Sequence, residues 1–476
     1  MYLWSDTENT AIQSQRPNDD RLDRAPVIDA RMRYHRDPLA RALADSAQAD
    51  DHVTRLHLAA RFGDVEAIRL LLEQGTSIDA RDKHFNTPLH SAASGENPEV
   101  VQFLLERGAD LEAKDSEDMH KTPLHIAAEN GNFAAARTLL DNGANIHARR
   151  KDLCTPLHRA SQSGNPDVVQ LLLKCGADLE AMDDEHKTPL HVTAYNGKVD
   201  AMRSLLDHGA NIEARDNDLW TPLHRASQSG HPGVVQLLLG RGSHLEAKSN
   251  GGGTPLHTAA YHGKADVVRS LLDHGANTEA RSEDLWTPLH AASLCGHPDV
   301  VQLLLERGAH LEAKNNVGGT PLYVAAYHGK ADAVRSLLDL GANIETRNKG
   351  LWTPLHAASG SGHPVVVRLL LERGAQLAVK NDGGASPLYI AAYNGKADAV
   401  RLLLDLGAYI ETRDNGLWTP LHVASEGGHP DVVQHLLERG ADVYAKNNNR
   451  KTPVQLAKKS GNQEVVRLFS IYTKRK

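Results

Sequence analysis

The stretch at 287–319, TPLHAASLCGHPDVVQLLLERGAHLEAKNNVGG, contains the signals that decide the fold. Thr287 can accept a hydrogen bond from a free amide of a first helical turn, and the proline after it has no amide that needs a partner. Gly296 ends this short helix, Pro298 begins a second helix rich in Val and Leu, and Gly308 ends that one. The remaining AHLEAKNNVGG carries Asn and Gly, which favour a hairpin turn. The stretch predicts a helix, a loop, a second helix and an extended finger.

This stretch is one copy of a repeat. The Thr (once Ser) that begins a tetrad similar to TPLH recurs at 54, 87, 122, 155, 188, 221, 254, 287, 320, 353, 386, 419 and 452. The step is 33 residues except between 87 and 122, where the loop DSEDMHK holds two extra residues. Helices this short are marginal in water until something packs on them. We therefore expect the copies to stack into a solenoid with one continuous core.

The repeat unit, with TPLHxAA, a central Gly, VVxLLL and GAxxxA, closely resembles the ankyrin repeat. The resemblance covers roughly 54–476. It implies a mainly α fold, an ankyrin-repeat α-solenoid of helix-loop-helix units with β-hairpin fingers. It also implies a concave side, made of finger tips and first helices, that binds other proteins. The family implies function only at that level.

The chain divides into an N-terminal extension, 1–50, and a repeat array, 51–476, of 13 repeats whose terminal copies act as caps. The extension mixes Asp, Arg and scattered Pro, a composition that favours partial disorder. As an alternative, the segment PLARALADSA at 38–47 docks as a helical cap on the first repeat. In the last copy, TPVQLAKKSG, two lysines suit a terminal repeat with one face in water.

Composition limits the classes of partner. The formal net charge is -7 and the isoelectric point about 6.4, so no broad basic field favours nucleic acid. Three cysteines are too few for a disulfide framework, and no apolar run is long enough to cross a bilayer. We expect an intracellular, monomeric protein, in the cytoplasm or the nucleus, that binds proteins and not nucleic acid or membrane.

From about residue 155 two kinds of repeat alternate with a period of 66 residues. One kind places Trp directly before the tetrad, and the other places Tyr seven residues after the anchor Thr, mostly followed by His or Asn. The resemblance implies that both positions face the groove. We therefore predict protein contacts for Trp220, Trp286, Trp352, Trp418, Tyr195, Tyr261, Tyr327, Tyr393, His262 and His328.

Two interpretations of the tryptophans stay open. Rigid amphipathic rings are frequent anchors of protein interfaces, each able to bury on the order of 150 to 250 Å². Alternatively, each Trp lies over the glycine-rich tip of a neighbouring finger and fills the space that its missing side chains leave. For the Tyr and His residues, contact with a partner is the preferred interpretation.

The 27 histidines do not form a metal site or a catalytic centre in this interpretation. Ten belong to the TPLH-type tetrad, and the resemblance implies that they tie finger to helix. Others, such as His231 and His297, precede Pro in a loop. The sequence lacks the motifs GxxxxGK[ST], HExxH, GxSxG and CxxC, so we expect no enzyme, metal or cofactor. The predicted function is a scaffold or adaptor; the alternative is an accessory or enzymatic component of a metabolic pathway that uses a Tyr/His/Trp-lined groove.

Overall fold

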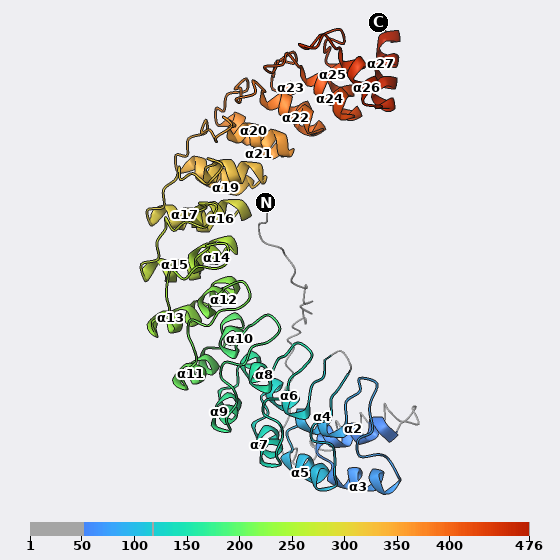
Figure 1. Cartoon of the computed structure of the whole chain (residues 1–476), viewed down its shortest axis with the longest axis vertical. Coiled ribbons are helices and arrows are strands. Elements are labelled where there is room, and N and C mark those ends of the chain that lie inside the picture. Colours follow the sequence, from blue (N-terminus) through green and yellow to red (C-terminus); the bar gives the residue numbers. More distant parts are fainter. Residues whose placement is uncertain (1–51, 117–118, 476) are drawn as a thin grey trace, which may run out of the picture.

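The computed structural model describes residues 52–116 and 119–475, which form a curved stack of helix pairs (Figure 1). The first helix of each pair lies on the inner side of the arc, and the second lies on the outer side. Neighbouring first helices pack against one another along the whole stack, and neighbouring second helices do so from the second repeat to the last. The expected extension at 1–50, including the possible cap at 38–47, lies outside the described residues.

The described residues contain 26 helices in thirteen pairs, so the predicted repeat architecture is confirmed. The first helices are α2 (His52–Phe62), α4 (Pro88–Ser94), α6 (Pro123–Glu129), α8 (Pro156–Ser163), α10 (Pro189–Tyr195), α12 (Pro222–Ser229), α14 (Pro255–Tyr261), α16 (Pro288–Cys295), α18 (Pro321–Tyr327), α20 (Pro354–Ser361), α22 (Pro387–Tyr393), α24 (Pro420–Gly427) and α26 (Pro453–Lys459). The second helices are α3 (Val65–Glu73), α5 (Pro98–Glu106), α7 (Phe133–Asp141), α9 (Pro166–Lys174), α11 (Val199–Asp207), α13 (Pro232–Gly240), α15 (Ala265–Asp273), α17 (Pro298–Glu306), α19 (Ala331–Asp339), α21 (Pro364–Glu372), α23 (Ala397–Asp405), α25 (Pro430–Glu438) and α27 (Gln463–Arg475).

The helix boundaries follow the local sequence signals. Thr287 is the N-cap of α16, its hydroxyl accepts from the backbone N–H of His290, and a proline occupies the first turn. Gly296 ends α16 with φ 83°, and Gly308 follows α17 with φ 87°, both in the left-handed region that favours glycine. The helix signals predicted from this repeat are therefore confirmed.

The fingers are hairpin turns, and the residues that the structure describes form no β-strand. In the finger before α16, the amide of Ser282 donates to the carbonyl of Trp286 (3.0 Å), and the amide of Leu285 donates to that of Ser282 (3.0 Å). One further bond, from Glu283 N to Gly251 O (3.1 Å), joins this finger to the preceding one. The predicted hairpin shape is present, but so few backbone bonds do not make a strand ladder.

The core is built from small side chains in the first helices and branched side chains in the second. Ala292 in α16 and Val301 and Leu304 in α17 are fully buried, and equivalent residues recur in each repeat. Small residues let neighbouring first helices approach closely, while Val and Leu fill the space between the two helix layers. The array thus has one continuous core in which each repeat needs its neighbours.

Buried histidines tie most repeats to the next, when each repeat is counted from the finger that precedes its first helix, so that Gly319 belongs with α18. The Nδ1 atom of His290 accepts from the amide of Thr287 (3.2 Å), and its Nε2 atom lies 3.1 Å from the carbonyl oxygen of Gly319 in the following repeat. Because a carbonyl can only accept, Nε2 carries the proton, and the imidazole is neutral. The same tie recurs at His57, His90, His125, His158, His191, His224, His257, His356 and His422.

A second interlock explains the two loop motifs HP and GK. Gly263 has φ 66°, and a Cβ on it would lie 2.6 Å from the ring of His297 in the next repeat. The Nε2–H of His297 donates to the carbonyl of Tyr261 (3.0 Å). Gly296 is covered in the same way by Lys330 of the repeat that follows. His297 is therefore a packing residue of the loop. Through the middle of the array, the loop glycine of each repeat is covered in turn by a His or a Lys of the repeat that follows.

Acid should destabilise the array through the tetrad histidines. Burial lowers the pKa from the ordinary 6.5 to about 4 at His125, His191, His224, His257, His290 and His356. As the pH falls, these histidines therefore bind protons in the unfolded chain before they do so in the folded chain. The free energy of unfolding is unaffected by them above pH 6.5 and decreases between pH 6.5 and about 4. Each histidine contributes about 3 kcal/mol across this window. Urea unfolding followed by circular dichroism at a series of pH values measures the slope.

The last repeat supplies a matched control, because Gln455 stands in place of the tetrad histidine and its Oε1 accepts from the amide of Thr452 (3.1 Å). A variant with His224→Gln, His257→Gln and His290→Gln keeps this cap and cannot titrate. We expect a shallower loss of stability in acid for the variant. Equal slopes for the variant and the native chain would show that other groups govern the acid response.

Candidate protein-binding face

The four tryptophans occupy equivalent places at the junction of finger and first helix, but their exposure differs. Trp220 is only 7% exposed, whereas Trp286, Trp352 and Trp418 are half-buried. Each ring packs beside the tetrad histidine of its own repeat, with ring centroids 5.7 to 6.0 Å apart. The tryptophans thus belong partly to the scaffold, and Trp220 offers almost no surface to a partner.

A buried ion pair covers Trp220. The guanidinium of Arg225 lies 4.7 Å from the ring centroid, and it pairs with the carboxylate of Asp216 at 2.7 Å. Arg225 and Asp216 are themselves buried. A cation over an indole face is attracted by the ring quadrupole, so this arrangement holds the ring in place. Burial therefore argues against Trp220 as an interface anchor, although the sequence grouped it with the others.

Two of the other tryptophans, Trp352 and Trp418, lie over a glycine of their own finger, whereas the finger of Trp286 has Asp284 at that position. A Cβ on Gly350 would lie 3.2 Å from Cδ1 of Trp352, and one on Gly416 would lie 3.0 Å from Cδ1 of Trp418. The packing interpretation expected the glycine-rich tip of a neighbouring finger instead. The contact that the structure gives is within one repeat, because the ring turns toward the first helix that follows it.

The tyrosines end the first helices of alternate repeats and reach solvent. Tyr195, Tyr327 and Tyr393 are 41%, 40% and 60% exposed, and Tyr261 is half-buried. Their main chain is held firmly, because the carbonyls of Tyr261, Tyr327 and Tyr393 accept hydrogen bonds from the loop histidines of the next repeats. Exposed rings on a fixed backbone lose little conformational entropy when a partner covers them.

The two histidines of this set stand beside the tyrosines. His262 packs edge-on against Tyr261, and His328 packs in the same way against Tyr327, both with ring centroids 5.0 Å apart. Desolvation lowers the pKa of His328, and the nearby Lys330 and His363 lower it further. His328 is therefore neutral at physiological pH and presents hydrogen-bonding nitrogens without a charge.

A row of leucines at the finger tips was not predicted. Leu219, Leu285, Leu351 and Leu417 have φ between 57° and 60°, and each is 42% to 47% exposed. The alternate repeats place glycine there, with φ 72° at Gly252. The left-handed region disfavours any residue with a Cβ by roughly 1 to 2 kcal/mol, and exposed Leu gains little to offset this. The signal was available in the sequence, since LW alternates with Gly-Gly before the tetrad.

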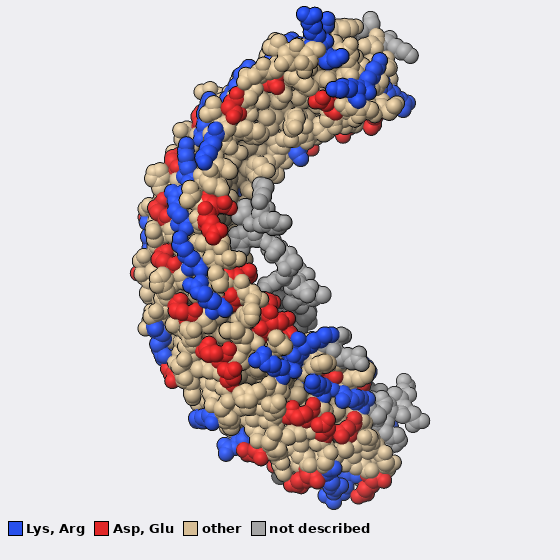
Figure 2. All heavy atoms as spheres, in the orientation of Figure 1, with Lys and Arg blue, Asp and Glu red and all other residues tan. Residues whose placement is uncertain are grey.

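The charged residues of the fingers mainly join one repeat to the next. The carboxylate of Glu279 accepts from the amide of His310 (2.8 Å), and the guanidinium of Arg281 donates to the carbonyl of Lys314 (2.7 Å). The basic row continues without a break through Arg215, Lys248, Arg281, Lys314, Arg347, Lys380, Arg413 and Lys446. Figure 2 shows Lys and Arg in a line along successive repeats with Asp and Glu beside it. On the face shown, acidic side chains therefore flank the basic row.

Within 52–116 and 119–475, no three His, Cys, Asp or Glu side chains come together in a way that could hold a metal ion. No helix in the same part of the chain is long and apolar enough to span a membrane. The tetrad histidines in particular are held apart, at most one in each repeat, by the ties described above.

Comparison with known proteins gives a family match. The family model described as ankyrin repeats (3 copies) matches residues 30–115, 113–183, 157–249, 233–315, 310–381 and 378–447. No curated protein matches the chain. Among solved structures, the human ASB11 ankyrin repeat domain is 34% identical, with 46% of this chain and 97% of that chain covered and a TM-score of 0.42. The ankyrin repeat domain of Bcl-3, titled a unique member of the IkappaB protein family, is 33% identical, with 46% and 99% covered and a TM-score of 0.40.

Replacing the finger-tip leucines by glycine should stabilise the array. Each of Leu285→Gly and Leu351→Gly relieves the left-handed strain, so we expect a gain of about 1 kcal/mol per site in the free energy of unfolding. Leu340 is the control, because it is 44% exposed but has φ -90°. Leu340→Gly should destabilise the chain. Urea unfolding compares the three variants, and a loss of stability at the finger tips would contradict the strain argument.

Proposed function

Because this chain belongs to the ankyrin-repeat family, whose repeats generally mediate interactions between proteins, we propose that it is a scaffold or adaptor whose concave face binds protein partners. Proteins of this family are typically interaction modules without enzymatic activity. The observation that carries the proposal is the recurrence of exposed apolar side chains on a rigid array. Tyr at the ends of first helices alternates with Leu at finger tips, a pattern that the scaffold itself does not need.

The proposed contact surface comprises the tyrosines, His262, His328 and the exposed parts of Trp286, Trp352 and Trp418. Trp220 is left out because its ring is already covered. Equivalent residues recur every second repeat, which corresponds to roughly 20 Å if each repeat adds about one helix diameter. A partner that uses several of them therefore extends along the array. Such a long, open surface suits a protein better than a small molecule, which needs a concave site that encloses most of its surface.

A metabolic or enzymatic role has no comparable support. That alternative requires a groove lined by Tyr, His and Trp that encloses a small molecule. The hollow described in the next subsection lies between second helices, and no Tyr, His or Trp lines it. We therefore do not carry this alternative further. A monomeric state and the lack of nucleic-acid binding stay predictions.

Truncating the exposed tyrosines together should weaken partner binding. The variant Tyr195→Ala, Tyr327→Ala and Tyr393→Ala removes three rings that are 40% to 60% exposed, so stability should change little. If the rings are interface anchors, we expect at least a tenfold loss of affinity. The measurement is affinity capture from the source cells with quantitative mass spectrometry, followed by titration of each captured partner.

The matched control is Tyr409→Ala with Tyr444→Ala. These rings are 70% and 76% exposed but lie between a second helix and the following finger, away from the first-helix ends. A partner of the concave face should be retained by the control and lost by the first variant. Partners that both variants retain equally would argue against the proposed surface.

A further inference from the structure

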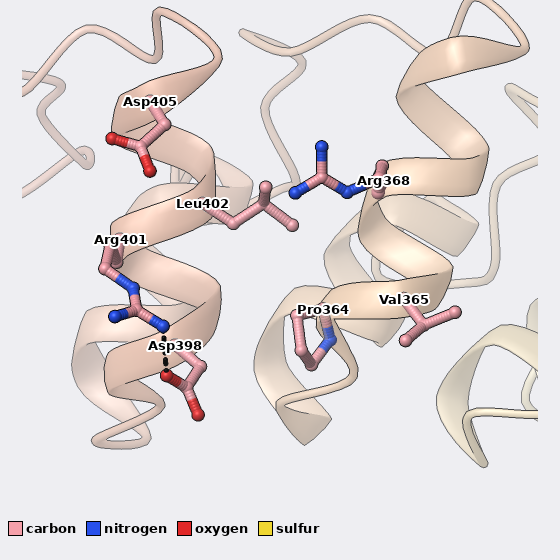
Figure 3. Close-up of a pocket in the computed structure, with 7 residues that line it drawn as sticks. All are labelled: Pro364, Val365, Arg368, Asp398, Arg401, Leu402 and Asp405. Carbon is pink, nitrogen blue, oxygen red and sulfur yellow. Dashed lines mark hydrogen bonds and ion pairs between the residues drawn. The ribbon is translucent and has the colours of Figure 1, made fainter.

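A hollow on the second-helix layer differs from every feature described so far. It lies between α21 and α23, on the side of the array opposite to the proposed concave face, and its volume is about 570 Å³. Figure 3 shows its walls, with Arg368 and Leu402 reaching toward each other from the two helices. The lining residues are Pro364, Val365, Arg368, Asp398, Arg401, Leu402 and Asp405.

Three of the seven lining residues depart from the pattern of the sister repeats. The second helices α9, α17 and α25 begin PDVVQ, whereas α21 begins PVVVR, so Val365 replaces Asp and Arg368 replaces Gln. The helices α11, α15 and α19 contain RSLLD, whereas α23 contains RLLLD, so Leu402 replaces Ser. The remaining sister helix, α13, begins PGVVQ, so the position of Val365 also varies there, but it keeps the Gln that Arg368 replaces. Three changes that meet in one hollow point to a property of this site.

The changes make the hollow more positive and more apolar. Replacement of Asp by Val and of Gln by Arg together raise the local charge by two units. Val365 is 66% exposed and follows Pro364 in α21, with its side chain pointing away from α23, while Leu402 is only 7% exposed and forms the wall on the α23 side (Figure 3). An aliphatic surface next to a guanidinium is a combination that recognises an amphipathic anion.

The acidic residues of the hollow are already neutralised. Asp398 pairs with Arg401 at 2.9 Å, and Asp405 pairs with Arg439 of α25. The Arg439 hydrogen bond is the main reason why the pKa of Asp405 lies below its usual value, and Arg368 contributes only a weak long-range effect. Among the described residues, Arg368 forms no ion pair. The lining residues alone are neutral, with two arginines and two aspartates. When Arg439 is counted as the partner of Asp405, the net charge is +1, and Arg368 is the arginine without an ion pair.

We propose that this hollow binds a carboxylate flanked by an aliphatic side chain, in an acidic segment of a partner protein. One uncompensated guanidinium matches the single charge of a carboxylate, which it can engage with two parallel hydrogen bonds. A phosphate group carries nearly two negative charges, and Arg368 can balance only one of them. The other charge would lie unbalanced near Asp398 and Asp405. Val365, Pro364 and Leu402 supply the surface for the aliphatic neighbour. The site is independent of the concave face, so an array could hold two segments at once.

The test replaces the three departing residues of the hollow by the residues that the equivalent second helices carry. The variant Val365→Asp, Arg368→Gln and Leu402→Ser installs residues with which the neighbouring repeats fold. Because Leu402 is only 7% exposed, its truncation should lower stability, so circular dichroism verifies the fold and the double variant Val365→Asp with Arg368→Gln is measured beside it. The probe is a fluorescein-labelled peptide of alternating leucine and glutamate, and fluorescence anisotropy measures its binding to the full chain. We expect at least a fivefold weaker affinity for the variant. A smaller loss would overturn the proposal.

Two further variants sharpen the result. Asp299→Val, Gln302→Arg and Ser336→Leu build the same hollow between α17 and α19, and this chain should bind two peptides in place of one. Arg335→Gln removes an arginine that does not line the hollow, and it should bind the peptide as the native chain does. The assignment of these residues would be overturned if the first variant still bound one peptide per chain. It would also be overturned if Arg335→Gln weakened peptide affinity as much as the Val365→Asp, Arg368→Gln and Leu402→Ser variant does.

Competition distinguishes the ligand classes. At equal ionic strength, isovalerate, a carboxylate with an aliphatic chain, should displace the peptide at lower concentration than inorganic phosphate does. Stronger displacement by phosphate would overturn the carboxylate assignment. The tyrosine variant of the concave face should bind the peptide with native affinity, so failure here and failure of the proposed protein-binding face can be told apart.

Discussion

The hydrogen bond from the tetrad histidine to the next repeat is the interaction on which the rest of the array depends. One imidazole caps its own first helix through Nδ1 and holds the following finger through Nε2–H, as His290 does between Thr287 and Gly319. Local capping and stacking are thereby joined in one buried, neutral side chain. Two repeats replace this His by Tyr, and in one of them Tyr389 donates instead to Asp414 of the following finger (2.8 Å). The tie is kept in that repeat although the atoms differ, which indicates that the link between repeats is what matters there.

Most of the fold could be predicted from the sequence because its determinants are local. Thr, Pro and Gly at fixed spacing specify helix ends. A 33-residue period implies that every copy packs against its neighbours in the same way. The extent of strand structure in the fingers was less accessible. Hairpin turn residues predict a reversal of the chain, but a ladder also needs several consecutive backbone bonds between extended segments. Each finger has too few of these.

The candidate site was only partly predictable, because exposure depends on neighbours that differ among otherwise equivalent repeats. The sequence groups Trp220 with Trp286, yet only Trp220 lies beneath an arginine that is fixed by a buried aspartate. Arg225 in α12 corresponds to Ala291 in α16, so a change one turn away decides how much of the ring a partner can reach. The strained leucines were overlooked for a different reason. Their conformation is a property of the finger backbone, and no preference of the residue itself predicts it.

An array of near-identical repeats separates scaffold from function more sharply than a globular domain does. Positions that every copy shares are explained by caps, by ties and by the alternating cover of loop glycines by His297 or Lys330. Departures from the shared pattern have no such explanation, because sister repeats fold without them. A single departure on a surface has little meaning, since surface substitutions usually change stability by less than half a kcal/mol. Val365, Arg368 and Leu402 differ in kind, because they come from two separate helices and meet in one hollow. Leu402 is 7% exposed and also packs in the core, but core packing gives no reason for an exposed valine close to a guanidinium without an ion pair. Recognition of a ligand is the explanation that uses Val365 and Arg368 together with the buried wall that Leu402 forms.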